Sequence, residues 1–479
     1  MKVSEYFNLN KTQPYLDFVD IPLHTDLSVY LDPTAIKSLD SAWGNELASF
    51  LGIFFETVLN RIASGKQQEA LSLLGFLHEA NEYHLGRSQN ESRGHGLGGD
   101  LTNSIWLNLV NSNAAVTGLL QDLEDTALLI DGVGSDMISD ALCNILRRPL
   151  IKYTQDMCLY YGISMEPEVD SGPLWNPQKE MWEHAFVQLP VTEYGKVILV
   201  PKILVRRNLD YQCDKYYRHY VLPAMQAEHL KKGSSLIQVL KNGVQRVTKK
   251  SLMLEYGNGK LAAVEQTVLR PHILQKYKED KLTNSSKPLT LTDFAEVENV
   301  ALPDLTELIC DLKNLQAGKA NASEYEELIE KILSVVFYPS LCHPKKQHSI
   351  HNGRKRIDIT YTNEAREGFF YWLSRHYAAG LIFVECKNYS GNVANPELDQ
   401  LAGRFSPSRG RVGILVCRSF NDKDLFIQRC IDTAKDDRGF IIPLDDDDIS
   451  SLVQAYQNQD NPNENDLTIL RRRFEMLIE

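Results

Sequence analysis

Short apolar runs alternate with amphipathic stretches in the last third of the chain. Apolar runs bounded by polar residues are typical of buried strands, and apolar positions three and four residues apart are typical of helices. The predicted strands lie at 357–359, 381–384, 412–417 and 440–444. The predicted helices lie at 323–337, 364–377, 396–405 and 424–436. Because the two kinds of element alternate, we expect an α/β domain over residues 301–479.

Residues 1–300 have mainly helical periodicity, with β character returning around 196–205. The predicted helices lie at 43–62, 67–82, 100–111, 117–129 and 135–161. We therefore expect a mainly α (α+β) recognition or regulatory region, with a break between two subdomains near 165–195. The polar run Tyr277–Pro288 is the best linker candidate and places the domain boundary near residue 300.

The chain has 479 residues with 51 basic and 63 acidic side chains, and its net charge of -12 argues against a general basic coat for binding nucleic acid. Its eight cysteines include no C-x-x-C pair, which is typical of reduced cysteines in a cytosolic protein and argues against a zinc site. No stretch approaches the roughly 18 apolar residues of a membrane span. We therefore expect a cytoplasmic protein with no membrane partner.

A glycine-rich segment precedes the predicted helix at 100–111. Gly94, Gly96 and Gly99 satisfy G-x-G-x-x-G, and Arg93 and His95 lie within reach of any phosphate bound there. The segment before it has a helical pattern, whereas a dinucleotide loop follows a strand. We interpret the segment as a flexible glycine loop and keep a phosphate site as the alternative.

Two predicted strands carry ionisable groups where apolar residues would be expected. Asp358 lies between two isoleucines, and Glu385-Cys386-Lys387 continues the apolar run 381–384. Because strand side chains alternate, Glu385 and Lys387 share one face and Cys386 lies on the other. These groups predict the divalent-metal site of a hydrolase. The same triplet at Glu279-Asp280-Lys281 follows no strand, and we interpret it as a solvated loop.

Cationic side chains surround these strands, as a polyanionic substrate would require. The loop before the first strand contains His343, Lys345, Lys346, His348, His351, Arg354, Lys355 and Arg356. A basic turn at 406–411 adds Arg409 and Arg411, and Gln400 and Arg404 share one face of the preceding helix. The mixed aromatic and basic segment Tyr211–His229 is interpreted as a half-buried helix, with stacking on nucleic acid as the alternative.

These motifs, in this order, resemble the PD-(D/E)XK nuclease superfamily, in particular its Mrr-like restriction endonuclease branch. The resemblance covers about residues 320–457. Its motifs are Tyr325-Glu326, Arg356-Ile357-Asp358, Val384-Glu385-Cys386-Lys387 and Gln400-x-x-x-Arg404. Ile357 stands where the superfamily's name-giving proline would lie, and Arg404 stands where the branch often has tyrosine.

The resemblance implies a restriction-endonuclease-like α/β domain with a mixed central sheet flanked by helices. It implies that Asp358, Glu385 and the carbonyl of Cys386 bind Mg²⁺, with Mn²⁺ as a substitute. Lys387 would activate water and stabilise charge on the phosphate, and Glu326 and Gln400 would assist catalysis. The expected DNA contacts are Arg354, Lys355, Arg356, Arg404, Arg409 and Arg411.

We therefore expect a Mg²⁺-dependent endonuclease that hydrolyses DNA phosphodiester bonds in bacterial defence against phage or foreign DNA. The N-terminal region would sense DNA or a protein partner of the defence system. Cleavage of both strands would require a homo-oligomer, since one site serves one strand. Two alternatives stay open: a non-cleaving nuclease-fold protein that binds DNA or acts as a scaffold, and a repair, recombination or RNA nuclease.

Overall fold

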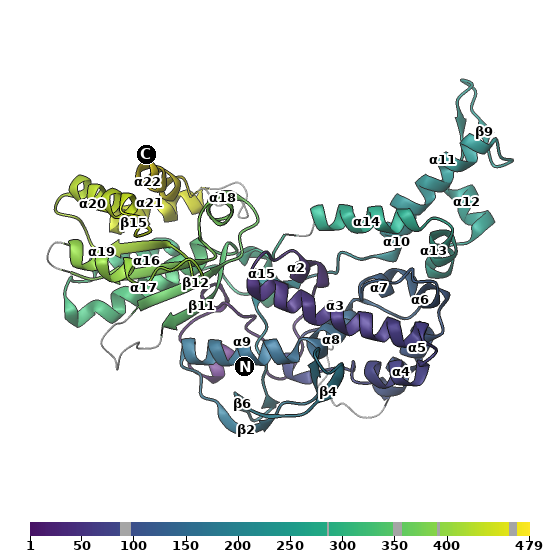
Figure 1. The fold of residues 1–479 in the computed structure, drawn as a ribbon, viewed down its shortest axis with the longest axis horizontal. Helices are drawn as coiled ribbons and strands as arrows, with labels where there is room; N and C mark the ends of the chain where they lie inside the picture. The colour runs from purple at the N-terminus through teal and green to yellow at the C-terminus, as the bar shows by residue number, and fades with distance from the viewer. Residues whose placement is uncertain (87–96, 285–286, 348–356, 390–392, 459–466) are drawn as a thin grey trace.

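The computed structural model describes residues 1–86, 97–284, 287–347, 357–389, 393–458 and 467–479 (Figure 1). The chain is mixed α/β. A sheet unit (residues 305–479) lies at one end of an elongated molecule, and a narrow arm (residues 222–256) projects from the other end (Figure 1). No helix in the described ranges has both the length and the apolar composition needed to cross a bilayer.

The sheet unit is built on five strands in sequence order. They are β11 (Leu341–Gln347), β12 (Ile357–Asn363), β13 (Leu381–Lys387), β14 (Val412–Cys417) and β15 (Phe440–Asp445). The first three strands are antiparallel, and β13, β14 and β15 are parallel. The mixed sheet predicted for this region is confirmed. Its central strands are apolar because helices cover both faces.

Two helical layers cover this sheet, and α17 and α20 lie on opposite sides of it (Figure 1). The first layer contains α16 (Leu305–Asn314), α17 (Ala322–Val336) and α21 (Asp446–Gln457). The second layer contains α19 (Asn395–Ala402), α20 (Lys423–Lys435) and α22 (Thr468–Ile478). The inserted helix α18 (Gly368–His376) joins β12 to β13. Both parallel crossovers thus place their helices, α19 and α20, on one face, as right-handed connections do.

Helices dominate the first 161 residues. They are α1 (Val3–Tyr6), α2 (Pro33–Lys37), α3 (Ala42–Ala63), α4 (Gln67–Leu74), α5 (Leu97–Val110), α6 (Asn113–Val116), α7 (Asp125–Leu129), α8 (Ser135–Ile145) and α9 (Arg147–Tyr161). The longest, α3, begins where the Ser41 hydroxyl accepts the N–H of Gly44 at 2.9 Å. It buries Leu47, Leu51 and Phe54 at helical spacing, which confirms the helix predicted at 43–62.

Short strands and further helices follow. The strands are β1 (Tyr30–Leu31), β2 (Glu166–Asp170), β3 (Leu174–Asn176), β4 (Met181–Glu183), β5 (Phe186–Leu189), β6 (Val191–Thr192), β7 (Gly195–Lys196), β8 (Val205–Arg206), β9 (Gln238–Val239) and β10 (Gln245–Arg246). The helices are α10 (Cys213–Tyr216), α11 (Leu222–Lys232), α12 (Lys249–Tyr256), α13 (Gly259–Val268), α14 (Pro271–Thr283) and α15 (Leu291–Glu298).

Several predicted elements of the N-terminal region are wrong. The segment 117–129 is mostly turn, with helix only at α7, and 135–161 is two helices that meet at Leu146. The predicted linker Tyr277–Pro288 is largely helix α14. Lys278 of α14 forms ion pairs with Asp122 at 2.5 Å and Asp125 at 3.1 Å. A charged side chain that suggested a solvated linker is thus paired with carboxylates from a distant part of the chain. The Glu279-Asp280-Lys281 triplet is therefore helical and not a loop.

The edge strand β11 packs against α9 of the N-terminal region. Asp17 joins the two, because its carboxylate accepts the Tyr153 hydroxyl at 2.7 Å and the backbone N–H of His343 at 2.9 Å. The His343 ring lies 3.4 Å from Asp156 and packs on Trp43. An edge that would otherwise be open to pairing is thus covered within the chain.

Candidate active site

Glu385 of β13 is a fully buried carboxylate between two cations. Its side chain is 0% exposed. The ammonium of Lys387 lies 2.6 Å from Oε1, and the Arg404 guanidinium donates to Oε2. Lys387 is 14% exposed and Arg404 is 8% exposed, so the lysine end of the cluster is the more open. The Glu385–Lys387 pairing follows from strand alternation, whereas the approach of Arg404 is tertiary.

The turn after α19 brings Arg404 to this position. The helix ends at Ala402, and the N–H of Arg404 bonds to the carbonyl of Leu401 at 3.0 Å. The next residue, Phe405, packs its ring on Phe383 with centroids 5.7 Å apart. Gly413 on β14 has no side chain here, and a Cβ atom would lie only 3.0 Å from Leu401 and Phe405. This close approach of helix to sheet holds the arginine above Glu385.

Asp358 is placed by strand register. Ile359 pairs with Val384 in the antiparallel β12–β13 ladder. Asp358 precedes Ile359 on β12, so its backbone lies next to the part of β13 that leads into Glu385. The side chain of Asp358 lies outside the part of the chain that the structure describes.

Gln400 and Glu326 come from helices on opposite faces of the sheet. Gln400 is half-buried on α19, one turn before Arg404. Glu326 is half-buried on α17, whose Tyr325 is buried near Cys386 and donates to Asp446 at 2.8 Å. Since Cys386 faces away from Glu385, the structure places α17 across the sheet from that carboxylate.

The start of α17 nevertheless lies at the same edge of the sheet. Asn388, which follows β13, donates to the carbonyl of Gly318 at 3.0 Å and accepts the N–H of Gly318 at 2.9 Å. Its amide also lies 3.3 Å from the carbonyl of Gln316. These bonds fix the segment before α17 beside the end of the strand that carries Lys387.

A second polar cluster lies along this edge, at the ends of β14 and β15. Burial raises the pKa of Asp446 to about 6, although the Tyr325 hydroxyl and Arg418 favour its ionised form. Arg418 also donates to the carbonyls of Leu312 and Leu315 at 2.8 and 2.7 Å. Asp445 caps α21 by accepting the N–H of Asp448 at 3.0 Å. These groups are engaged in holding the helices.

The basic turn at 406–411 does not lie at Glu385. Arg409 and Arg411 precede β14 at the opposite end of the sheet, where Gly410 lies against Leu381. Four residues of strand separate that end from Glu385, a distance of about 13 Å. Arg411 pairs with Asp437 at 2.7 Å, and Arg409 bonds to Ser406 at 3.2 Å. Arg354, Lys355 and Arg356 lie outside the described residues.

Few side chains near Glu385 are available as metal ligands. Among the described side chains, which do not include that of Asp358, no three histidines, cysteines or acids are arranged to hold a metal ion. The Glu385 carboxylate is the kind of hard oxygen ligand that Mg²⁺ prefers. The residues therefore fit a magnesium site if Asp358 supplies the second carboxylate.

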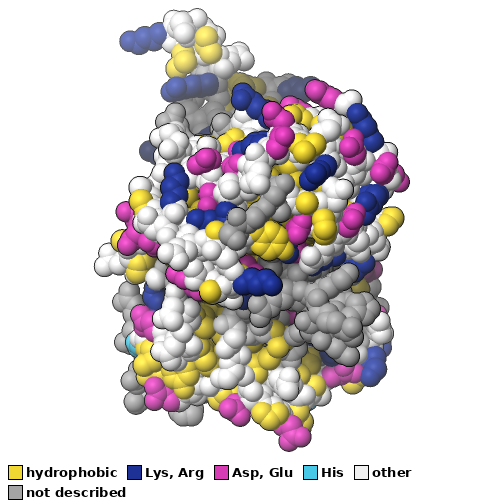
Figure 2. Space-filling view, turned by 90° about the vertical axis from the view of Figure 1, so that its left-hand side faces the viewer, with side chains coloured by type: hydrophobic (Ala, Val, Ile, Leu, Met, Phe, Trp, Pro, Cys, Tyr) yellow, Lys and Arg dark blue, Asp and Glu magenta, His cyan; other side chains and the backbone are white. Residues whose placement is uncertain are grey.

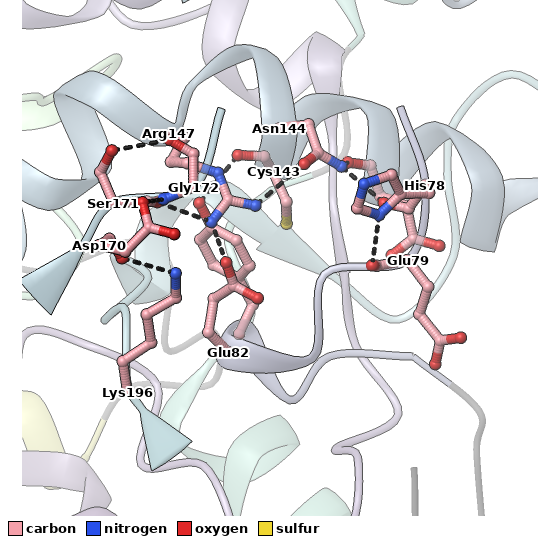
Figure 3. Close-up of polar contacts among 12 residues, drawn as sticks. His78, Glu79, Glu82, Cys143, Asn144, Arg147, Asp170, Ser171, Gly172 and Lys196 are labelled. Carbon is pink, nitrogen blue, oxygen red and sulfur yellow. Dashed lines mark hydrogen bonds and ion pairs between the residues drawn. The ribbon is translucent and has the colours of Figure 1, made fainter. Parts of the chain in front are cut away.

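A second buried cluster, around Arg147, lies in the N-terminal region (Figure 3). Arg147 begins α9, pairs with Glu82 and donates to Asn144 at 2.9 Å and to the carbonyl of Ser171 at 3.2 Å. Burial lowers the pKa of Arg147 to about 10. Lys196 bonds to the carbonyl of Asp170 at 2.7 Å beside it. Because each partner belongs to a different local element, we interpret the cluster as a structural cross-link.

Sequence reasoning missed the role of Arg404 as a partner of Glu385. Its position four residues after Gln400, directly before the aromatic Phe405, was the available signal. The glycine motif at 94–99 falls mostly outside the described residues, although Gly99 lies in α5. The segment before it is a short 3-10 turn at Asn81–Tyr83 and not a strand.

Comparison with known proteins gives a family match over part of the chain. A family model described as "Domain of unknown function (DUF8370)" matches residues 8–212. None of the curated proteins and none of the solved structures matches the chain. The matched part includes Asp17, Tyr153 and Arg147 and ends before both the arm and the sheet unit. The chain is thus similar to this family over the region that packs against β11.

Proposed function

We propose that the chain is a Mg²⁺-dependent endonuclease that hydrolyses phosphodiester bonds of DNA. The observation that carries this proposal is the buried Glu385 beside Lys387, on the strand that pairs with the one bearing Asp358. A carboxylate inside an otherwise apolar strand is costly to bury and persists only with charged partners.

A magnesium ion would be held by Asp358, Glu385 and the carbonyl of Cys386. When bound, it would polarise the scissile phosphate and lower the pKa of a water molecule. Mn²⁺ takes similar oxygen ligands and is expected to substitute.

Four side chains around Glu385 and the neighbouring edge of the sheet have different roles in this proposal. Lys387 has three N–H donors and the greater exposure, so it stabilises negative charge that grows on the phosphate and orients the attacking water. Arg404 holds the Glu385 carboxylate in place from the α19 side. Gln400, one turn earlier on α19, is the candidate neutral donor for a phosphate oxygen. Glu326 remains a candidate helper from the edge where α17 begins.

The biological setting we propose is bacterial defence against phage or foreign DNA, in the cytoplasm. Residues 1–300 would sense DNA or a protein partner, and their direct contact with β11 offers a route to the sheet unit. A homo-oligomer would supply a second site for the second strand of a duplex.

A second candidate function is a DNA-binding or scaffold protein that keeps this architecture without cleaving. The observation that favours it is the double pairing of Glu385, whose two oxygens already face Lys387 and Arg404. A carboxylate neutralised in this way has less tendency to bind a cation.

Incubation of the purified full chain with supercoiled and linear DNA, with Mg²⁺, Mn²⁺ or EDTA, separates the two candidates. We expect nicking or degradation with either metal and none with EDTA. Asp358→Asn, Glu385→Gln and Lys387→Met should each abolish it, while the exposed Lys313→Met should not. Tight DNA binding with no cleavage of DNA or RNA under any of these conditions would establish the second candidate instead.

A further inference from the structure

The arm carries a cluster of positive charge that the proposed site does not use. Residues 229–254 contain six lysines and arginines and no aspartate or glutamate, in a chain whose net charge is -12. The six cations are Lys231, Lys232, Lys241, Arg246, Lys249 and Lys250. Within the described residues, none of them forms an ion pair with a carboxylate, and all except the half-buried Lys249 are exposed. Unpaired charge of one sign on an exposed element attracts a polyanion.

The charge lies on a projecting two-stranded ribbon and on the helix ends that flank it: Lys241 and Arg246 belong to the hairpin, Lys231 and Lys232 end α11, and Lys249 and Lys250 begin α12. The hairpin β9–β10 follows α11 and stands away from the rest of the molecule (Figure 1). In Figure 2 the part that rises above the rest shows lysine or arginine and apolar side chains and no acidic ones. The sheet end in the same view shows acidic and basic side chains interspersed. The arm is therefore electrostatically distinct from the sheet end.

The hairpin has a fixed turn. The N–H of Leu240 bonds to the carbonyl of Val244 at 2.9 Å, and the N–H of Gly243 bonds to the carbonyl of Leu240 at 2.9 Å. Gly243 has φ +79°, the left-handed conformation that closes such a loop at little cost. The turn is thus held by its own backbone without support from the body of the protein.

Apolar side chains occupy the tip. Val239 is 65% exposed and Val244 is 52% exposed, on either side of the turn. Exposed valines on a solvated hairpin gain nothing from water, whereas apolar side chains at a ribbon tip contact thymine methyl groups or wedge between bases. The tip therefore suits a groove better than bulk solvent.

We propose that this hairpin binds double-stranded DNA, with the six cations on phosphates and the tip valines in the major groove. A two-stranded ribbon fits that groove, which is about 12 Å wide, whereas the major groove of duplex RNA is too narrow. The inference rests on the proposed function for the identity of the polyanion. It assigns to residues 222–256 the DNA contact that steers a duplex toward the chain.

The test measures DNA binding separately from cleavage. The full chain binds a fluorescein-labelled 30-base-pair DNA in EDTA, followed by anisotropy at several salt concentrations. The hairpin variant combines Lys241→Ser and Arg246→Ser on the hairpin with Lys250→Ser at the start of α12. The matched control removes the same charge from exposed sites elsewhere, as Lys66→Ser, Lys313→Ser and Arg472→Ser.

We expect the hairpin variant to bind at least about tenfold more weakly and the slope of log K against log salt to flatten by about 2.7, for three lost phosphate contacts. The control should keep the wild-type slope. Val239→Ser with Val244→Ser should weaken binding without changing the slope. Circular dichroism and thermal melting should match the wild type, because these side chains are solvent-exposed.

Wild-type affinity in the hairpin variant, or an equal loss in the control, would overturn the inference. So would equal, hairpin-dependent binding of duplex RNA, or a hairpin that binds an acidic protein partner while DNA binding is intact. Loss of DNA binding through the hairpin can be distinguished from loss of cleavage. Glu385→Gln should bind the labelled DNA in EDTA as tightly as the wild type does. A protein that binds DNA through the hairpin but never cuts keeps this inference and rejects the proposed function.

Discussion

The backbone N–H of His343 donates a 2.9 Å hydrogen bond to Asp17, a residue 326 positions earlier in the chain. The same carboxylate accepts the Tyr153 hydroxyl. One buried acid therefore ties the edge strand β11 to α9 and to the first segment of the region matched by the family model. This contact is one of several that join the N-terminal region to the sheet unit, since Ser41 also donates to Glu364 and Lys11 pairs with Glu330.

Replacement of Asp17 by alanine should destabilise the folded chain by about 3 kcal/mol, because two buried donors lose their acceptor. Urea unfolding followed by tryptophan fluorescence measures the change, since Trp43 packs on His343. The exposed Asp311→Ala on α16 serves as the control, with an expected change under about 0.5 kcal/mol. Equal effects of the two substitutions would show that the Asp17 contact contributes little.

Stability should fall as pH rises from about 4.5 to about 7, in part through Glu364. Burial raises the pKa of Glu364 to about 7, while its bonds with Ser41 and the charge of Arg366 oppose the rise and nearby Asp17 and Asp40 add to it. The unfolded chain releases this proton first, near its ordinary pKa of 4.5. Stability due to the protonated group is thus present below pH 4.5 and lost toward pH 7.

The difference in unfolding free energy between the wild type and Glu364→Gln isolates the contribution of Glu364. Other acids whose pKa is raised, such as Glu124 and Asp140, contribute equally to both proteins. Glutamine cannot ionise. Between pH 4.5 and pH 7 the wild type should therefore lose about 3 kcal/mol more stability than the variant does. Urea midpoints at half-unit pH steps give the comparison. Parallel curves for the two proteins would mean that Glu364 titrates alike in the folded and unfolded states.

Arg404→Met should destabilise by about 3 kcal/mol, because the buried Glu385 loses one of its two cations. Adding Glu385→Gln should restore part of that loss, so the double variant is less destabilised than the sum of the single ones by more than about 1 kcal/mol. The cycle is measured by urea unfolding. The exposed pair Arg438 and Asp399 provides the control, where Arg438→Met should change stability by less than about 1 kcal/mol.

Gly439→Ala should disturb the site through Phe405. A Cβ atom at Gly439 would overlap the Phe405 ring and lie 2.9 Å from the carbonyl of Arg411, and the backbone has φ +103°. We expect a loss of about 3 kcal/mol and a displaced Arg404, seen as lower DNA cleavage. Gly52→Ala is the matched control: nothing lies within 4 Å of its Cβ position in α3, so it should stabilise by about 0.5–1 kcal/mol. Unchanged stability of Gly439→Ala would contradict the packing described.

The sequence by itself determined four of the five strands and several helices of the sheet unit, whereas β11 lies in a segment that was predicted as a basic loop. β14 is buried on both faces and is an unbroken apolar run, and β13 is apolar from Leu381 to Val384 before it reaches Glu385, so both strands can be identified from the sequence. The stripe of Leu398 and Leu401 likewise marks α19, because helix periodicity is local. Strand alternation also predicted that Glu385 and Lys387 share a face, as the 2.6 Å pairing requires.

Only the tertiary structure decided which charges meet. Arg404 reaches Glu385, while Arg411, seven residues later, pairs with Asp437 at the other end of the sheet. Lys278 pairs with Asp122 and Asp125, and the segment predicted as a linker is largely helix. The physical reason is that periodicity reports burial along one element, whereas the partner of a buried charge depends on which distant elements pack beside it.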